Sequence, residues 1–375
     1  MHEDFDFIVA GAGMVGSAIA YGLAGACQRV LLLDGEDGDY RAAKANFGLV
    51  WVSGKGYGNP HYQRLSYQAG RLWPAFARDL EQESGIAVQY ENRGGLNFCL
   101  GQAQFEERSQ AMRQWAAHTP DLALGVEMLD RAALQRRFPA VRFGSDVTGA
   151  CFGSHDGHVN PLRLLAALQA AFLKRGGVLK SRHPVERIEA PAGGGFTVHS
   201  GAARFAARHV VIAAGLGSSK LGPMVGLDAP VRPQRGQLLV TERLAPLLPV
   251  PASGIRQTGD GTVMLGVTQE NVGYDVTTTA EAAVRISRNA LRVLPDLAGA
   301  RLVRQWACLR VMTPDGCPVY AGSASHYGAW TALCHSGVTL ASFHAGPLAR
   351  ALAGGALPSF LDPLHYERFH VPQAA

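Results

Sequence analysis

Residues 5–34 read FDFIVAGAGMVGSAIAYGLAGACQRVLLLD, and this segment contains the most specific structural motif of the sequence. The apolar run 5–10 predicts a buried parallel strand, residues 17–26 predict a helix, and the apolar run 30–33 predicts a second strand that ends on Asp34. A glycine-rich G-x-G-x-x-G turn joins the first strand to the helix. This order and spacing are typical of a dinucleotide-binding crossover, although a plain structural turn is the alternative.

Each glycine of the turn has a physical role in such a crossover. Gly11 permits the tight turn, Gly13 lets a pyrophosphate approach the backbone, and Gly16 lets the helix pack closely on the strand. The helix N-terminus then offers N–H groups and a positive dipole end to the phosphates. Asp34 can accept hydrogen bonds from a ribose. NAD and FAD both use this turn, but the sequence has no second G-x-G-x-x-G, and the strand and turn HVVIAAG at 209–215 favours a tightly held flavin.

Composition places the chain among compact enzymes. With 375 residues it can form two domains, and 47% of its residues are hydrophobic while 17% are charged. The net charge of +5 is modest, and no block of lysine and arginine contains interleaved aromatic residues. Nucleic-acid binding is therefore not expected, whereas an anionic substrate or a weakly anionic membrane surface suits the charge.

The sequence gives indications of the cellular location and of possible metal sites. The chain starts directly on the first strand and has no apolar stretch long enough for a membrane-spanning helix, so we expect a cytoplasmic protein, with peripheral attachment to the inner membrane face as a variant. Its six cysteines form no C-x-x-C pair, which fits a reducing compartment and argues against zinc or an iron–sulfur cluster. His155 and His158 in HDGH could suggest a metal, but a turn at a domain boundary is the simpler interpretation, and we expect no metal.

The order of the elements predicts an α/β fold with an α+β substrate part. Nucleotide-fold elements occur at the start, the middle and the end of the chain, with β-rich segments between them. We therefore expect a Rossmann-like FAD-binding domain interleaved with a β-rich substrate domain. The predicted bounds are 1–84, 142–220 and 296–375 for the FAD-binding domain, and 85–141 and 221–295 for the substrate domain.

Six segments, taken in order, carry a resemblance to a known family. They are GAGMVGSAIAYGL with Asp34, DGHVNPLRLL, HVVIAAGLGSS, PQRGQLLVTE, LRVMTPDGCPVY and CHSGVTLA. Together they resemble the motifs of the glycine oxidase/D-amino-acid oxidase family of FAD-dependent oxidoreductases, over about residues 5–355. NFGLVWVSGKG and CHSGVTLA look most similar to the β subunits of opine and D-hydroxyproline dehydrogenases, with the hydrogen cyanide synthase subunit more distant.

The resemblance implies a cofactor site. Gly11, Gly13 and Gly16 would hold the pyrophosphate, Asp34 the ribose and the Val185 backbone the adenine. Backbone N–H groups of residues 337–340 would face the isoalloxazine, where donors stabilise a reduced flavin, although a glycine turn that starts the last helix is the alternative. The remaining implied cofactor residues are Met14, Val15, Ala42, Ala43, Lys44, Asn46, Phe47, Gly48, Ala214, Gly215, Gly337, Val338, Thr339 and Leu340.

Three positions depart from the family pattern. Asp34 stands where glutamate is usual, Cys334 and His335 stand where glycine–histidine is frequent, and Val311 follows Arg310 where proline is usual. We therefore transfer no detailed substrate preference from the oxidase members.

The same resemblance implies the reaction and two pocket residues. Hydride would pass from the α-carbon of an amine to flavin N5, and positioning would dominate, so no catalytic base is nominated. Arg310 matches the arginine that binds the substrate carboxylate, while a structural salt bridge is its alternative role. His335 would line the pocket. Cys308 falls on the flavin-linking cysteine of monomeric sarcosine oxidase, but FAD held without a covalent bond is the main expectation and a buried core cysteine the simpler interpretation.

The predicted function is that of an FAD-dependent dehydrogenase acting on a D-configured, cyclic or N-substituted amino acid such as D-hydroxyproline or an opine. One alternative is an oxidase that uses oxygen. Another is a non-catalytic flavoprotein subunit of an electron-transfer complex. We expect a small amino-acid substrate, together with partner subunits or a respiratory electron acceptor.

Overall fold

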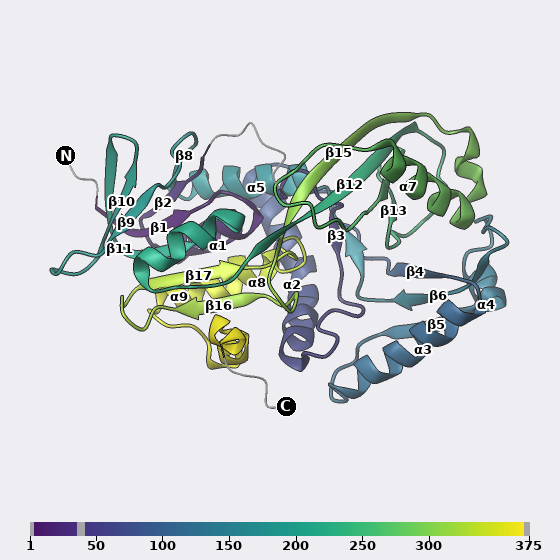
Figure 1. Cartoon of the computed structure of the whole chain (residues 1–375), viewed down its shortest axis with the longest axis horizontal. Helices are drawn as coiled ribbons and strands as arrows, with labels where there is room; N and C mark the ends of the chain where they lie inside the picture. Colours follow the sequence, from purple (N-terminus) through teal and green to yellow (C-terminus); the bar gives the residue numbers. More distant parts are fainter. Residues whose placement is uncertain (1–3, 36–41, 371–375) are drawn as a thin grey trace.

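Two main β-sheets organise the chain, and Figure 1 shows them in separate lobes. The structure is a computed structural model that describes residues 4–35 and 42–370. The first sheet has eight strands, ordered β16-β17-β11-β1-β2-β8, and the β9–β10 pair extends it from β11. These strands are β1 (Asp4–Ala10), β2 (Val30–Leu33), β8 (Val178–Lys180), β9 (Arg187–Glu189), β10 (Phe196–Ser200), β11 (Ala203–Ile212), β16 (Val319–Gly322) and β17 (Ala329–Leu333).

β1 lies inside the first sheet and runs parallel to both β11 and β2. Its side chains alternate between two cores: Phe7 and Val9 join one, while Ile8 and Ala10 join the other. This burial on both faces explains why the strand is an unbroken apolar run. Helices cover the first of these faces (Figure 1). They are α1 (Met14–Gly25), α2 (Pro60–Ser84), α5 (Pro161–Lys174), α8 (Ala341–Phe343) and α9 (Ala349–Ala353), with a π-helical turn over His344–Leu348 between the last two.

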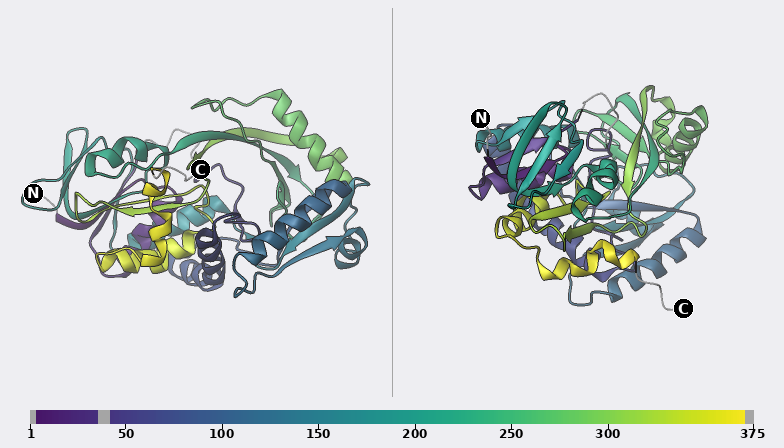
Figure 2. Two further views of the ribbon diagram at one scale, coloured as in Figure 1. Left: turned by 60° about the horizontal axis from the view of Figure 1, so that its bottom comes forward. Right: turned by 60° about the vertical axis from the view of Figure 1, so that its left-hand side comes forward.

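The second lobe is built on antiparallel strands. Its four-stranded sheet, ordered β13-β14-β12-β15, consists of β12 (Arg232–Arg243), β13 (Ile255–Gln257), β14 (Thr262–Gly266) and β15 (Leu302–Met312). A three-stranded sheet, ordered β4-β6-β5, consists of β4 (Gly95–Leu100), β5 (Val126–Asp130) and β6 (Val147–Gly153). Helices α3 (Gln102–Ala117), α4 (Arg131–Arg137) and α7 (Ala280–Val293) belong to this lobe, and Figure 2 shows the long β12 and β15 curving away from the first lobe. Outside these groups lie the paired short strands β3 (Leu49–Val50) and β7 (Gly157–His158), the helix α6 (Ser218–Leu221) and several short 3-10 helices.

The four-stranded sheet presents different residues on its two faces. On one face Leu239 and Leu265 join a core with Ile286 of α7. On the other face Leu238 and Cys308 pack against residues of the first lobe. The strand period of two therefore directs every second side chain of β12 and β15 toward the first lobe.

The mixed α/β fold class with a Rossmann-like parallel sheet is confirmed. The strand pairing differs from the predicted bounds at two places. β6 lies in the segment 142–220 but pairs with β4 and β5, and β15 lies in the segment 296–375 but pairs with β12. An apolar run predicts a buried strand, but it does not say which sheet the strand joins, because its pairing partner lies far away in the sequence.

Helix caps follow the sequence closely. The Asp130 side chain accepts from Ala133 N at 2.7 Å, and Asn160 caps α5 one residue before Pro161. The segment 86–100 contains β4, and Glu91 before it forms an isolated bridge with His158.

Among the described residues, no helix is both long enough and apolar enough to cross a membrane.

Candidate active site

The glycine-rich turn is shaped by contacts that a side chain would break. Gly11 has φ +104°, and a Cβ there would lie 2.5 Å from the carbonyl oxygen of Ala213. A Cβ on Gly16 would lie 1.8 Å from the carbonyl oxygen of Gly11. Around Gly13 the nearest atom to an added Cβ would be Ala43 Cβ at 3.8 Å. Gly11 and Gly16 are therefore fixed by packing, whereas the surface at Gly13 has room for a ligand group to approach the backbone.

The N-terminus of α1 suits a phosphate. Its N-cap is Gly13, which has no side chain to accept from the first N–H groups, and its first turn contains no acidic residue. The C-terminal turn lies against this helix end: a Cβ on Gly337 would lie 3.4 Å from Met14 Cβ and 3.3 Å from Val15 Cγ2. Two segments from opposite ends of the chain therefore meet here.

Ala214 and Gly215 border the same turn. A Cβ on Gly11 would lie 2.7 Å from the Cα of Ala214. Gly215 has φ +58°, and a Cβ there would lie 3.3 Å from Val311 Cγ2 at the end of β15. These residues therefore join the turn to the strand that carries Arg310.

Asp34 lies half-buried just after β2. Its N–H donates to the Lys180 carbonyl at 3.1 Å, and its own carbonyl accepts from His183 N at 2.7 Å. These bonds place Asp34 beside the segment that leads to Val185, which is itself partly buried. The predicted ribose and adenine residues thus lie along neighbouring chain segments.

Asn46 has a structural task in the predicted flavin loop. Its amide nitrogen donates to the carbonyls of Ala42 at 3.0 Å and Ala43 at 2.9 Å, and its oxygen accepts from Gly48 N at 2.8 Å. Lys44, within this loop, is partly buried, and Phe47 packs against the cluster that contains Cys308. The Asn46 side chain therefore stabilises the loop through three hydrogen bonds to the backbone. Its amide nitrogen and oxygen are already used in these bonds.

The turn 336–340 partly differs from its expected role. The Thr339 hydroxyl oxygen accepts from Trp51 N at 3.0 Å, and the Thr339 carbonyl accepts from Trp73 Nε1 at 2.8 Å. The N–H of Leu340 donates to the Ser336 carbonyl at 3.0 Å, so this group is engaged in the turn rather than available to a cofactor. In the described part of the chain, no hydrogen bond uses the N–H of Gly337, Val338 or Thr339. These three N–H groups are available as donors to a bound ring, and this role stays a prediction.

Together these features fit a dinucleotide cofactor: a helix end without a cap, a glycine that leaves room beside it, and three N–H donors on the facing turn.

Arg310 lies on β15, on the face directed toward the first lobe. Its Nη1 donates to Gln234 Oε1 at 3.1 Å and its Nη2 to the Thr268 carbonyl at 3.0 Å. A Cβ on Gly236 would lie 2.9 Å from Nη2, so the guanidinium lies directly over this glycine. Burial lowers the pKa of Arg310, but an arginine remains charged. No carboxylate among residues 4–35 and 42–370 forms an ion pair with it.

A second polar group lies around His335. Lys55 Nζ lies 3.3 Å from His335 Nε2 and donates to Ser336 Oγ at 2.8 Å, and the Tyr62 hydroxyl also donates to Ser336 Oγ at 2.8 Å. Burial, followed by the charges of Lys55 and Arg310, lowers the pKa of His335, so its imidazole is neutral. Burial lowers the pKa of Lys55 to about 8, so the ammonium form predominates at neutral pH.

Sequence reasoning did not nominate Lys55, Tyr62, Ser336, Gln234 or Thr268. Lys55 had a usable signal, because it stands between two glycines in a turn of a segment already quoted for its resemblance. Gln234 belongs to the quoted PQRGQ segment. Tyr62 and Thr268 carried no signal, because only the fold brings them to the pocket.

Cys308 is buried, with 5% of its surface exposed, and its Sγ lies 3.6 Å from the Ala45 carbonyl. Burial raises the pKa of the Cys308 thiol, which opposes the thiolate form needed for nucleophilic chemistry.

His155 and His158, the two histidines of the HDGH segment, each have a partner within the protein. His155 Nε2 lies 2.8 Å from the Ala123 carbonyl, and His158 Nδ1 lies 3.3 Å from Arg256 Nη1. No cluster of three or more potential metal ligands occurs in the ranges that the structure describes.

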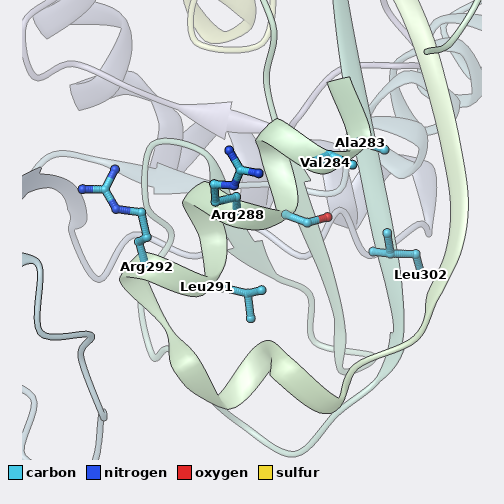
Figure 3. A pocket seen from close by; sticks show the side chains of 7 residues that line it. Ala283, Val284, Arg288, Leu291, Arg292 and Leu302 are labelled. Carbon is cyan, nitrogen blue, oxygen red and sulfur yellow. The ribbon is translucent and has the colours of Figure 1, made fainter. Parts of the chain in front are cut away.

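A groove of about 580 Å³ lies elsewhere, between α7 and the start of β15 (Figure 3). It is lined by Ala283, Val284, Ser287, Arg288, Leu291, Arg292 and Leu302. None of these is a predicted site residue, so the groove is separate from the site described above.

Comparison with known proteins agrees with this geometry. A family model described as DAO, FAD dependent oxidoreductase, matches residues 6–351. An opine oxidase subunit from Agrobacterium tumefaciens (strain Ach5) is 39% identical over 371 residues, which cover 99% of each chain. Glycine oxidase of Pseudomonas putida is 27% identical over 366 residues, covering 96% of this chain and 97% of that protein. The crystal structure of glycine oxidase from Geobacillus kaustophilus shares the fold with a TM-score of 0.89 at 24% identity, covering 99% of this chain and all of that one. The chain belongs to the DAO family of FAD-dependent oxidoreductases.

Proposed function

We propose that this FAD-dependent oxidoreductase is a dehydrogenase that oxidises the Cα–N bond of a D-configured, cyclic or N-substituted amino acid, with an opine-like secondary amine as the foremost candidate. The single observation that carries this proposal is Arg310, a half-buried guanidinium held by Gln234 and the Thr268 carbonyl. The relative at 39% identity, which is named as part of an opine oxidase, supports the same substrate class.

The substrate carboxylate binds Arg310 in this proposal. A carboxylate brought into a partly apolar pocket needs a cation, and a guanidinium can hold both oxygens and so fix the rotation of the substrate. Because Gln234 and Thr268 already fix the guanidinium, little of its motion is lost on binding. The α-carbon is thereby oriented relative to the turn 337–339.

The amine must react in its neutral form. Oxidation requires a nitrogen lone pair to form the C=N bond while the α-hydrogen leaves with the bonding electrons. The proton of a substrate ammonium would pass to solvent as the substrate binds, and no side chain is assigned as its base. FAD, when bound, supplies the two-electron acceptor for this oxidation.

The cofactor is FAD. We propose that it is held without a covalent bond, because burial opposes the thiolate form of Cys308. Acid precipitation tests this point: a yellow supernatant is the expected result, and a yellow pellet would show a covalent flavin. We further propose that the chain works with partner subunits that take up its electrons, because its relative in Agrobacterium is named as a subunit. The cytoplasm stays the predicted location.

An anaerobic titration tests the proposed function. The FAD-loaded chain is mixed with D- and L-amino acids, proline derivatives and opines while the visible flavin band is followed. Loss of the band with one substrate class is expected, whereas a flavin that no amino acid reduces would indicate a non-catalytic role. Admitting air afterwards separates the two enzyme types, since a dehydrogenase should reduce an added dye quickly and form hydrogen peroxide slowly.

A further inference from the structure

Lys55 is a second cation near Arg310, close enough for the charge of Arg310 to lower the pKa of Lys55. It comes from the turn after β3, on the side of the first lobe, while Arg310 comes from β15 of the second lobe. His335 lies within electrostatic range of both cations. Lys55 Nζ is placed by two neutral partners, Ser336 Oγ at 2.8 Å and His335 Nε2 at 3.3 Å.

The contacts of Lys55 do not by themselves explain a charge at this position. In the described ranges no carboxylate lies within ion-pair distance of Lys55. The nearby Asp156 favours the ammonium form only from farther away, and its Oδ1 accepts from the N–H groups of Val52 and Ser53. Two neutral contacts do not require an ammonium, and an ammonium without a close counter-ion in a partly buried place is costly. Such an arrangement is typical of a group kept for a ligand.

We propose that Lys55 binds a second carboxylate, so that the pocket selects amino acids carrying two carboxylates over those carrying one. This inference rests on the proposed function, because it assumes that Arg310 holds the first carboxylate. In a secondary amine flanked by two carboxylate-bearing carbons, one carboxylate would face Arg310 from above the four-stranded sheet and the other would face Lys55. The nitrogen and the α-carbon would then be fixed between two anchors.

The two anchors also distinguish Lys55 from a purely structural residue. Loss of a structural lysine would weaken every ligand alike or destabilise the fold. Loss of a second-carboxylate anchor would weaken dicarboxylates alone. A charged hydrogen bond of this kind accounts for about a 10- to 100-fold difference in affinity.

The test uses ligands that cannot be oxidised at a C–N bond. Diglycolate carries two carboxylates on either side of an ether oxygen, and methoxyacetate carries one. Each is titrated into the FAD-loaded full-length chain, and the perturbation of the flavin spectrum gives its Kd. We expect the wild-type chain to bind diglycolate at least about tenfold more tightly than methoxyacetate.

Three variants are compared with it. Lys55→Met should reduce this preference to about threefold or less while leaving methoxyacetate affinity nearly unchanged, and Lys55→Arg should restore much of the preference. Lys220→Met, at an exposed position in α6, is the matched control and should behave as wild type.

The outcomes decide between the two proposals. A wild-type chain without preference for diglycolate, or a Lys55→Met variant that weakens both ligands equally, would overturn the second-carboxylate site. Because no turnover is measured, a failure of the proposed function would show separately, as a flavin that no amino acid reduces in the anaerobic titration. If the protein prefers diglycolate but no amino acid reduces its flavin, the second-carboxylate site would stand and the proposed reaction would be wrong.

Discussion

At the scale of single residues, the position of the Arg310 guanidinium depends on Gly236, which has no side chain. A Cβ on Gly236 would lie 2.9 Å from Arg310 Nη2 and 3.1 Å from its Cζ. The guanidinium is the far end of a flexible side chain, so it can move aside without disturbing the strand. Gly236→Ala should therefore fold normally and retain FAD, but it should raise KM by about tenfold or more because the carboxylate anchor is displaced. Steady-state kinetics together with a thermal melt measures both effects, and an unchanged KM would mean that the position of Arg310 does not matter.

Asp34 gives a second prediction at this scale. Its backbone is fixed by Lys180 and His183, so changing its side chain leaves these two hydrogen bonds in place. Asp34→Ala should weaken FAD binding by about 1–3 kcal/mol, because a ribose hydroxyl would lose its acceptor. Asp34→Glu should retain most of the affinity. Equilibrium dialysis of the apoprotein with FAD provides the measurement, and wild-type affinity in Asp34→Ala would remove this carboxylate from the site.

At the scale of elements, a buried carboxylate organises the turn that carries Lys55. Asp156 has no exposed surface, and its Oδ1 accepts from Val52 N at 2.7 Å and Ser53 N at 3.0 Å. Asp156→Ala would leave both N–H groups without this acceptor and should lower the free energy of unfolding by about 1–3 kcal/mol. Asp156→Asn, which keeps one acceptor oxygen, should lose less.

Urea unfolding of the FAD-loaded protein checks this difference. The matched control is Asp146→Ala, which removes an exposed carboxylate paired with Arg292 and should cost less than about 1 kcal/mol. Equal losses in Asp156→Ala and Asp146→Ala would mean that Asp156 does not support the turn.

Elements with local signals could be predicted from the sequence. The first strand, the helix after the glycine-rich turn and the second strand were predicted, because an apolar run and a turn act within a few residues. The sheet that β6 and β15 join could not be predicted, because the pairing of β15 with β12 joins residues on opposite sides of α7 in the sequence. Local patterns identify a strand more readily than they identify its neighbour.

At the scale of the whole molecule, the site is assembled from segments of both lobes. The N-terminal turn, the loop 42–48 and the turn 336–340 belong to the first lobe, while Arg310 and Gln234 come from the four-stranded sheet of the second (Figure 1). Roles for the residues expected to bind the cofactor could be assigned from the sequence, because the family resemblance extends over most of the chain. Thr268 could not be placed, because only the folding of the second lobe brings its carbonyl to Arg310. Lys55 offered only its position between two glycines as a signal.

The anchoring of a substrate carboxylate by Arg310 is the central claim, and its most direct test is the kcat/KM of Arg310→Ala. The control is Arg304→Ala, which removes an exposed arginine from the same strand. Both variants should fold and retain FAD. We expect Arg310→Ala to lower kcat/KM by a factor equivalent to about 2–5 kcal/mol of transition-state stabilisation. Arg310→Lys should recover only part of this loss, and Arg304→Ala should behave as wild type. A folded, FAD-loaded Arg310→Ala enzyme with wild-type kcat/KM would show that Arg310 does not anchor the substrate carboxylate.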